Sequence, residues 1–395
     1  MTIDLSTVRA HTPGLEHSNH MLACGAALMP QVVVDAITDH VQLEARIGGY
    51  EAAAQQVEML ENVYTDVARL LGAKPHEIAL MENATAAWCQ VFYGLELKAG
   101  DRVLTCQAEY AANYVAYLHR AKRDGIIIEV VPNDESGALD LAALEAMLAE
   151  PTALISITWV PTNGGLVNPA EGVGKLAQRF DVPYLLDACQ AVGQMPVDVA
   201  ALGCDFLTAT GRKFLRGPRG IGFLYIREDM ISKTEPAVID LFSAPWVGKD
   251  RYELRTDARR FENWENAYAL RAGLGAAVRY ALDIGIENIQ SRAWGLADRL
   301  RAELHHQEGA TVQDAGDTQC AIVSFSVTNI DPYKLMAYLK ECGISIGVSR
   351  RNSTLLDSEL RNLPTMLRAA PHYYNSETEI DTLVACIKTY QQMIS

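Results

Sequence analysis

The sequence predicts an α/β fold with a mainly parallel sheet, and three observations support this prediction. From 155 to 225 the chain alternates apolar, strand-like runs with helical segments, as a parallel α/β sheet does. The apolar run 182–186 ends in a carboxylate, Asp187. Lys213 lies among small, turn-forming residues and is followed by a Gly/Pro-rich loop and the apolar run 221–225. Because ligands of open α/β sheets bind at the carboxyl ends of strands, Asp187 and Lys213 are candidate site residues.

The remaining elements follow from apolar periodicity. In the first half we expect an irregular arm at 1–20, a helix at 31–45, a Gly-Gly break at 48–49, and a long helix to about 71. Strands are predicted at 77–81, 102–106, 126–131 and 153–158, with helices from about 82 and at 139–148. After a crossover near 250–270 we expect helices at 267–282, 286–305 and 332–341, strands at 321–327 and 344–348, and a final helix from 377.

Composition limits the classes of function. The 395 residues are 49% hydrophobic, which is enough for a large core and two domains. A formal charge of −15 argues against nucleic acid as a partner, because phosphate neutralisation needs a basic face. No apolar run is long enough to span a bilayer, so we expect no membrane association.

The cysteine pattern and the N-terminal residues indicate the compartment. The eight cysteines form no CxxC pair, and we expect them to be reduced and mostly buried. The first residues lack a basic region followed by an apolar one, so no signal peptide is expected. We therefore expect a cytoplasmic protein, and no cluster of residues suggests a metal site.

Lys213 has the surroundings of an activated amine. Arg212, Arg216 and Arg219 lie close to it in the sequence, and repulsion between like charges lowers the pKa of a lysine. A neutral amine is what a Schiff-base nucleophile needs. A solvated loop lysine is the alternative, just as an N-cap after a strand is the alternative for Asp187. Taken together, a Schiff-base lysine and a carboxylate for a ring nitrogen are the pair that pyridoxal phosphate (PLP) requires.

These two stretches, in this order and spacing, resemble the class V aminotransferase/cysteine desulfurase family of PLP enzymes, and the resemblance covers nearly the whole chain. It implies a PLP-dependent aminotransferase fold (fold-type I). The large PLP-binding domain would comprise residues 21–258, and the small α+β domain residues 1–20 and 259–395. It also implies a homodimer with composite active sites.

The resemblance further implies a set of cofactor-binding residues beside the Lys213 Schiff base and the Asp187 carboxylate. The helix that begins near residue 84 would bind the PLP phosphate, since helix N-termini favour anions. Tyr110 stands where desulfurases carry a histidine stacked on the ring, although a tyrosine that merely packs is the alternative. A gapless match places Thr162 where the family has an asparagine, and we favour the adjacent Asn163. The implied cofactor contacts are Ala84, Thr85, Ala86, Tyr110, Asn163, Asp187, Gln190, Thr210, Arg212 and Lys213.

Three further residues are implied to contact the substrate. Arg368 matches the family's arginine for the α-carboxylate, to which a planar guanidinium can donate two parallel bonds. Tyr50 follows the Gly-Gly break, which resembles the active-site lining of some C–S lyases, although a plain loop is the alternative. Trp264 lies where relatives carry a small-residue stretch with a threonine that reaches the partner's phosphate. This departure puts that contact in doubt.

The reaction is less well indicated than the cofactor. Desulfurases of this family carry a persulfide-forming cysteine on a loop after the last strand, but residues 349–354 contain none. The chain is therefore most similar in motifs to C–S lyases such as hercynylcysteine sulfoxide lyase and cyst(e)ine lyase, which implies β-elimination on an S-substituted cysteine. No histidine occurs between His119 and His305, so acid/base work in the sheet-borne site would fall to Lys213, Tyr110 or a residue from elsewhere, and Lys213 is the natural proton carrier at Cα. Transamination, racemisation and a catalytically silent PLP-binding regulator remain as alternatives.

Overall fold

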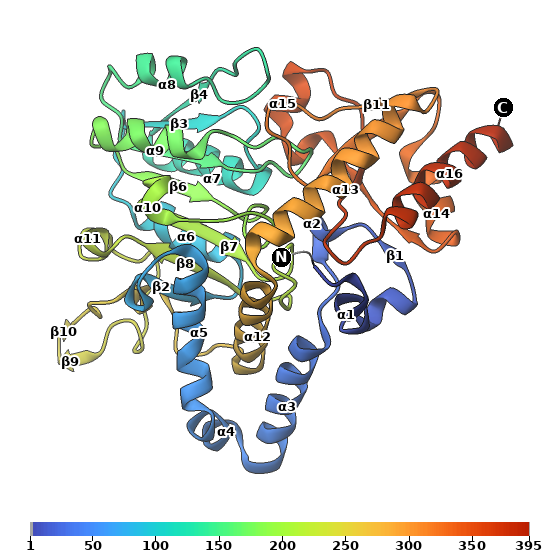
Figure 1. Cartoon of the computed structure of the whole chain (residues 1–395). Coiled ribbons are helices and arrows are strands. Elements are labelled where there is room, and N and C mark those ends of the chain that lie inside the picture. Colours follow the sequence, from blue (N-terminus) through green and yellow to red (C-terminus); the bar gives the residue numbers. More distant parts are fainter. Residues whose placement is uncertain (1–2, 395) are drawn as a thin grey trace.

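The computed structural model describes residues 3–394, and a seven-stranded sheet forms its centre (Figure 1). The strand order is β2-β8-β7-β6-β5-β3-β4. Only β8 runs against the others. The strands are β2 (Ile78–Met81), β3 (Arg102–Cys106), β4 (Ile127–Val131), β5 (Leu154–Thr158), β6 (Tyr184–Asp187), β7 (Phe206–Thr210) and β8 (Gly222–Ile226). β2 and β5 to β8 are buried along their whole length, which is why they occur as continuous apolar runs.

Helices connect these strands and cover the sheet. The long connections let consecutive strands run parallel. The connections contain α6 (Ala84–Gly94), α7 (Ala111–Asp124), α8 (Leu141–Met147), α9 (Ala170–Arg179) and α10 (Val199–Leu202), while α5 (Val57–Leu71) precedes β2 and α11 (Glu228–Ile231) follows β8. Gly222 must be a glycine, because a Cβ there would lie 2.5 Å from Ala209 O and 3.1 Å from Ala84 N. This close approach places the start of α6 beside β7.

A second, antiparallel sheet has the order β11-β12-β15-β14. Its strands are β11 (Ala310–Val312), β12 (Val323–Val327), β14 (Gly347–Ser349) and β15 (Met366–Ala369). The helices around it are α13 (Ile286–His306), α14 (Pro332–Glu341), α15 (Leu355–Leu360) and α16 (Glu377–Ile394). The two-sheet α/β architecture agrees with the predicted fold.

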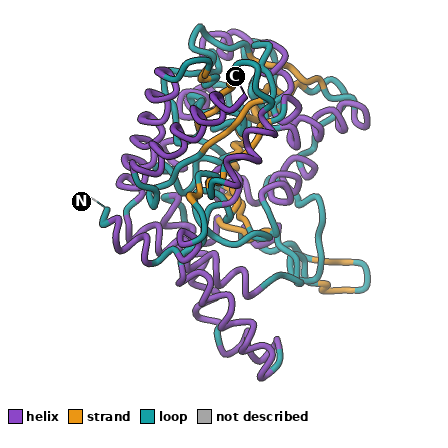
Figure 2. The backbone as a smooth tube through the Cα atoms, turned by 90° about the vertical axis from the view of Figure 1, so that its right-hand side faces the viewer, coloured by secondary structure: helices purple, strands orange, loops and turns teal. Residues whose placement is uncertain are grey.

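The remaining helices are α1 (Leu5–Ala10), α2 (Ala23–Ala26), α3 (Gln31–Ile47), α4 (Gly49–Gln55) and α12 (Tyr268–Ile284). Of these, α3 and α4 extend from the body together with α5 (Figure 1). Figure 2 shows a hairpin, β9 (Trp246–Gly248) and β10 (Arg251–Tyr252), that projects separately from the body. Within residues 3–394, no helix combines the length and apolarity that a bilayer crossing requires.

Three predicted elements were wrong in detail. The N-terminal arm is not irregular throughout, because Asp4 caps α1 by accepting hydrogen bonds from Ser6 N and Thr7 N. The predicted strand 344–348 is two strands: β13 (Ile344–Ser345) pairs with β1 (Asn19–His20), and β14 joins the four-stranded sheet. The long helix to residue 71 is interrupted at Gln56, between α4 and α5.

Candidate active site

The candidate active site lies at the carboxyl edge of the seven-stranded sheet. Asp187 is the last residue of β6 and Thr210 the last of β7. Met81, which ends β2, and Thr210 both pair with Gly222. The N-terminus of α6, Thr210 and Asp187 are therefore at the same edge, as parallel strand direction requires.

Asp187 is held in a buried position, with 5% of its surface exposed. Its Oδ1 accepts a hydrogen bond from Cys189 N at 3.0 Å, and its Oδ2 accepts one from Asn113 Nδ2 at 3.0 Å. These bonds fix the carboxylate plane. The N-cap alternative for Asp187 is not what the structure shows, because the residues that follow form a turn rather than a helix.

Lys213 lies in the turn after β7 and is partly buried. Its pKa is lowered, first by burial and then by Arg212 and Arg368, while Cys189 and Asp187 oppose this shift. The pKa of Lys213 is thus shifted in the predicted direction, but burial is the main cause and repulsion between like charges is a smaller one. Arg216 faces elsewhere: it is fully buried and donates to Leu28 O, Tyr373 Oη and Thr12 Oγ1, each at 2.7 Å.

Two further contacts hold the lysine turn in place. Arg212 is half-buried and donates from Nη1 to Gly25 O, and its own carbonyl accepts from Ala27 N at 2.9 Å. Gln190 Nε2 donates to Cys24 O at 3.1 Å. The small-residue segment 24–27 therefore packs against both Gln190 and Arg212, at the same edge as Lys213.

The second sheet supplies Arg368 from β15. Its Nη1 donates to Thr162 Oγ1 at 2.7 Å and to Thr162 O, while Nε is buried and lacks a protein acceptor. Arg368 contributes to lowering the pKa of Lys213, so the two cations are near enough to interact electrostatically. Thr162 therefore orients the guanidinium, a role that the sequence did not indicate.

Asn163 connects the large sheet with the segment 349–354. Its Nδ2 donates to Thr354 Oγ1 at 2.8 Å and to Arg350 O at 3.2 Å, whereas Oδ1 is buried without a partner. This segment is thus pinned over the turn that follows β5. The cysteine-free loop is an ordered part of the cleft.

The predicted phosphate site coincides with the N-terminus of α6. Asn83 caps α6 by accepting from Ala86 N at 2.9 Å. Ala84 is buried, Ala86 is half-buried and Thr85 is exposed. The first turn of a helix carries N–H groups without intrahelical acceptors, and an anion can bind there.

Two predicted substrate residues lie apart from this cleft. Tyr50 is 79% exposed and Trp264 is 47% exposed. Both line a hollow of about 450 Å³ together with Glu44, Gly49 and residues 265–269. Lys213, Asp187 and Arg368 are not among its lining residues. Within one chain, Tyr50 and Trp264 therefore lie near each other and not at the candidate active site.

Sequence reasoning also missed His372. It is fully buried, its Nε2 lies 2.7 Å from Phe214 O, and burial holds its pKa well below the ordinary value. A neutral imidazole that donates to this carbonyl fixes the backbone directly after Lys213. The one sequence signal for the burial of His372 is that it lies in a mainly apolar stretch, residues 366–374.

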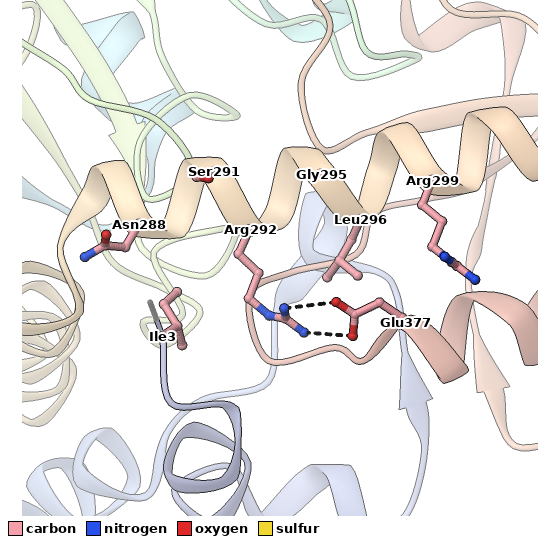
Figure 3. Close-up of a pocket in the computed structure, with 8 residues that line it drawn as sticks. All are labelled: Ile3, Asn288, Ser291, Arg292, Gly295, Leu296, Arg299 and Glu377. Atoms are coloured by element: carbon pink, nitrogen blue, oxygen red, sulfur yellow. Dashed lines mark hydrogen bonds and ion pairs between the residues drawn. The ribbon is translucent and has the colours of Figure 1, made fainter. Parts of the chain in front are cut away.

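A pocket of about 350 Å³ between α13 and α16 is not part of the site (Figure 3). Arg292 spans it and pairs with Glu377 at 3.2 Å. The same guanidinium also donates to Tyr373 O and Asn375 O. Arg292 is therefore used to join two helical segments of the fold.

The cleft suits PLP on the chemistry of its side chains. Gln190 Oε1, Asn163 Oδ1, Thr208 Oγ1 and Arg368 Nε are buried polar atoms without a protein partner, and buried polar groups ordinarily have one. The candidate site also contains a lysine of lowered pKa, a fixed carboxylate and a helix N-terminus. The fold and the site together define an enzyme of the PLP-dependent fold-type I class.

The comparisons with known proteins place the chain more narrowly. Residues 21–383 match the aminotransferase class-V family, and the chain belongs to that family, whose cofactor is PLP. A probable cysteine desulfurase from Methanothermobacter thermautotrophicus is 30% identical over 384 residues, which are 95% of each chain. The predicted fold, cofactor and enzyme class are therefore confirmed.

Solved structures agree with this placement. The apo structure of a cysteine desulfurase from Thermococcus onnurineus NA1 matches with a TM-score of 0.93 and 27% identity, over 100% of this chain and 99% of that one. The cystine C-S lyase C-DES, in complex with its reaction product cysteine persulfide, matches with a TM-score of 0.86. That match covers 95% of this chain and 99% of the lyase at 24% identity, so it supports the fold alone.

Proposed function

We propose that this protein is a PLP-dependent lyase that cleaves the C–S bond of an S-substituted cysteine by β-elimination. The observation that carries the proposal is an ordered, cysteine-free segment at 349–354, which Asn163 joins to the candidate site. Net, such a reaction takes up water and releases a thiol (or the corresponding sulfur group), pyruvate and ammonia. The known relatives include both cysteine desulfurases and a cystine lyase.

In this proposal the residues of the candidate site would hold the cofactor. Bound PLP draws electrons from Cα of an amino acid joined to it. Lys213 would hold the cofactor covalently, and Asp187 would face its ring nitrogen. Tyr110 would cover the ring, and Gln190 and Asn163 would donate to its polar edge. The phosphate would lie at the positions supplied by Ala84, Thr85, Ala86, Thr210 and Arg212.

The protein's own groups would then act on the substrate. Arg368 would bind the α-carboxylate through its free guanidinium edge, since Nε has no protein acceptor. Once the substrate amine has displaced it, Lys213 would take the proton from Cα. A lowered pKa makes the amine neutral more often, which is what a general base near neutral pH needs.

A protein thiol is not required for this chemistry. The sequence from Gly343 to Ala385 contains no cysteine. Cys189 is a thiol that interacts with both Asp187 and Lys213, and its pKa is raised well above the ordinary value by burial and by Asp187. A protonated thiol is a poor sulfur acceptor, so Cys189 would be a bystander.

Product analysis tests the reaction. Purified protein with PLP should release pyruvate and ammonia in equal amounts from a panel of S-substituted cysteines, and the Cys189→Ala variant should keep turnover within about threefold because no bond to sulfur passes through it. An enzyme persulfide detected by mass spectrometry, with alanine as product, would instead indicate a desulfurase. Keto acid formed only with an amino acceptor would indicate an aminotransferase, and inverted substrate would indicate a racemase.

We further propose a homodimer in which Tyr50 and Trp264 complete the partner's site. Both side chains are exposed in the single chain, as are Trp246 on the projecting hairpin and Leu241 before it. Large exposed apolar groups of this kind mark interaction surfaces. Light scattering should give twice the 43.3 kDa chain mass, and Trp246→Asp should produce a monomer with much reduced turnover. A fully active monomer would contradict the composite site.

The residue ranges of the two sheets support a division of the chain into two domains at residue 258. All strands of the large sheet come from residues 78–226, and all strands of the four-stranded sheet from residues 310–369. We propose that 21–258 is the cofactor domain, and that 1–20 together with 259–395 is the small domain. The pairing of β1 with β13 is consistent with the first segment belonging to the second unit.

A further inference from the structure

One buried carboxylate behind the cofactor cleft has no role in the chemistry described above. Glu109 follows β3 and is 3% exposed. Its Oε1 accepts hydrogen bonds from Tyr110 N at 2.7 Å, from Asn113 Nδ2 at 3.0 Å and from Thr158 Oγ1. Its Oε2 accepts from Thr105 Oγ1 at 2.9 Å and from Tyr117 Oη at 3.3 Å.

Two of these donors lead directly to residues of the proposed cofactor site. Tyr110, whose ring would cover the cofactor, is held by its backbone N–H. Asn113 donates to Glu109 Oε1 and also to Asp187 Oδ2, each at 3.0 Å. The amide of Asn113 therefore bridges two carboxylates, and its orientation is fixed by both.

The sheet order explains how this arrangement arises. β3, β5 and β6 are adjacent, and Thr105, Thr158 and Asp187 stand at or near their carboxyl ends. Thr158 is the register partner of Asp187. Glu109 lies over these three strand ends, so one side chain can contact the turn that carries Tyr110 and the amide that meets Asp187.

The position is costly for a carboxylate. Burial, with a smaller contribution from the nearby Asp187, raises the pKa of Glu109 to about 7 against the opposing hydrogen bonds from Thr158, Asn113 and Thr105. The other titratable groups that face it are Cys106 and Tyr117. A second acid beside Asp187 adds repulsion that an apolar side chain would avoid, so packing alone does not account for it.

We propose that Glu109 is a positioning residue that holds Tyr110 and, through Asn113, Asp187 in the places where they meet the cofactor ring. This inference rests on the proposed cofactor site. Glu109 itself would not bind the cofactor, since its two oxygens already accept from six protein donors, Cys106 Sγ included. Its effect is to fix the covering ring and the ring-nitrogen partner relative to each other.

The test separates position from charge. Glu109→Ala removes the acceptors, and we expect PLP to bind at least tenfold more weakly, with a shifted absorbance maximum of the bound cofactor. Glu109→Gln keeps a carbonyl oxygen that can accept from Tyr110 N and Asn113, while the amide can donate to Thr105 and Tyr117. We therefore expect this variant to bind PLP within about threefold of wild type. Asn113→Ala should weaken binding and shift the absorbance by cutting only the branch to Asp187.

Glu77 provides a matched control. It is also a buried glutamate that accepts two backbone N–H bonds, from Lys74 and Glu228. It precedes β2, where Ile78 pairs with Tyr225 near the end of β8, and so lies at the opposite edge of the sheet. Glu77→Ala should lower the melting temperature of the apoprotein but leave PLP affinity unchanged.

Three outcomes would overturn the inference. Glu109→Ala could fold and bind PLP like wild type with the same absorbance. Glu109→Gln could bind as weakly as Glu109→Ala, which would assign the effect to charge. If Glu109→Ala does not fold, wild-type binding by Asn113→Ala would refute the link to Asp187. Failure of the wild-type protein itself to take up PLP would instead reject the proposed function, which keeps the two tests distinct.

Discussion

Replacing Lys213 by alanine should abolish turnover while leaving a protein that still binds PLP without a covalent bond. Two contributions are lost together: the amine that joins the cofactor and the base that takes the Cα proton. General acid–base catalysis alone typically contributes 10²- to 10⁴-fold, so we expect a decrease in kcat of at least about 10³-fold. Asp187, Gln190 and the α6 N-terminus are unchanged in this variant and should retain the cofactor.

Borohydride reduction measures the covalent part of this prediction. In the wild-type protein it should fix PLP to the peptide that contains Lys213, and in Lys213→Ala to none. Lys175→Ala is a suitable control, because this exposed lysine lies on α9, away from the cleft. Residual turnover above one per cent in Lys213→Ala, or labelling of another lysine, would contradict the assignment.

The sequence predicted the large sheet well because its strands are continuous apolar runs ended by turn residues, and such runs are visible locally. Every predicted strand from 77 to 225 lies within two residues of the observed one. The run 344–348 failed because its first half pairs with Asn19 and His20, more than 300 residues away in the chain. No local pattern separates the residues that join one sheet from those that join another.

The site was predictable to the same degree and for the same reason. The position of Asp187 and Lys213 at the carboxyl edge of the sheet could be predicted, because Asp187 ends an apolar run and Lys213 lies among turn-forming residues before the next one. The connections among residues could not be found. The bridge from Glu109 through Asn113 to Asp187 depends on β3, β5 and β6 being neighbours, and the bond from Arg368 to Thr162 joins the two sheets. Both follow from tertiary packing and not from spacing.

Replacing Arg368 by alanine should leave PLP binding normal but lower kcat/KM for the amino acid by at least tenfold. The guanidinium is held at one end by Thr162 Oγ1 and Thr162 O, so its orientation is set before substrate arrives and little side-chain entropy is lost on binding. Each hydrogen bond to a charged group is worth about 1.5–3 kcal/mol. If the substrate carboxylate loses two such hydrogen bonds, kcat/KM should fall by more than tenfold.

Graded variants make this prediction specific to geometry. Arg368→Lys keeps the charge but not the planar fork, and should recover only part of the loss. Thr162→Val removes one of the bonds that orient Arg368 and should raise KM by a smaller factor, with the cofactor absorbance of the free enzyme unchanged. Arg350→Ala, an exposed arginine on the segment over the cleft, serves as the control for loss of positive charge. Substrate-induced change in the cofactor spectrum gives the binding readout, and an Arg368→Ala variant with wild-type kinetics would show that the α-carboxylate binds elsewhere.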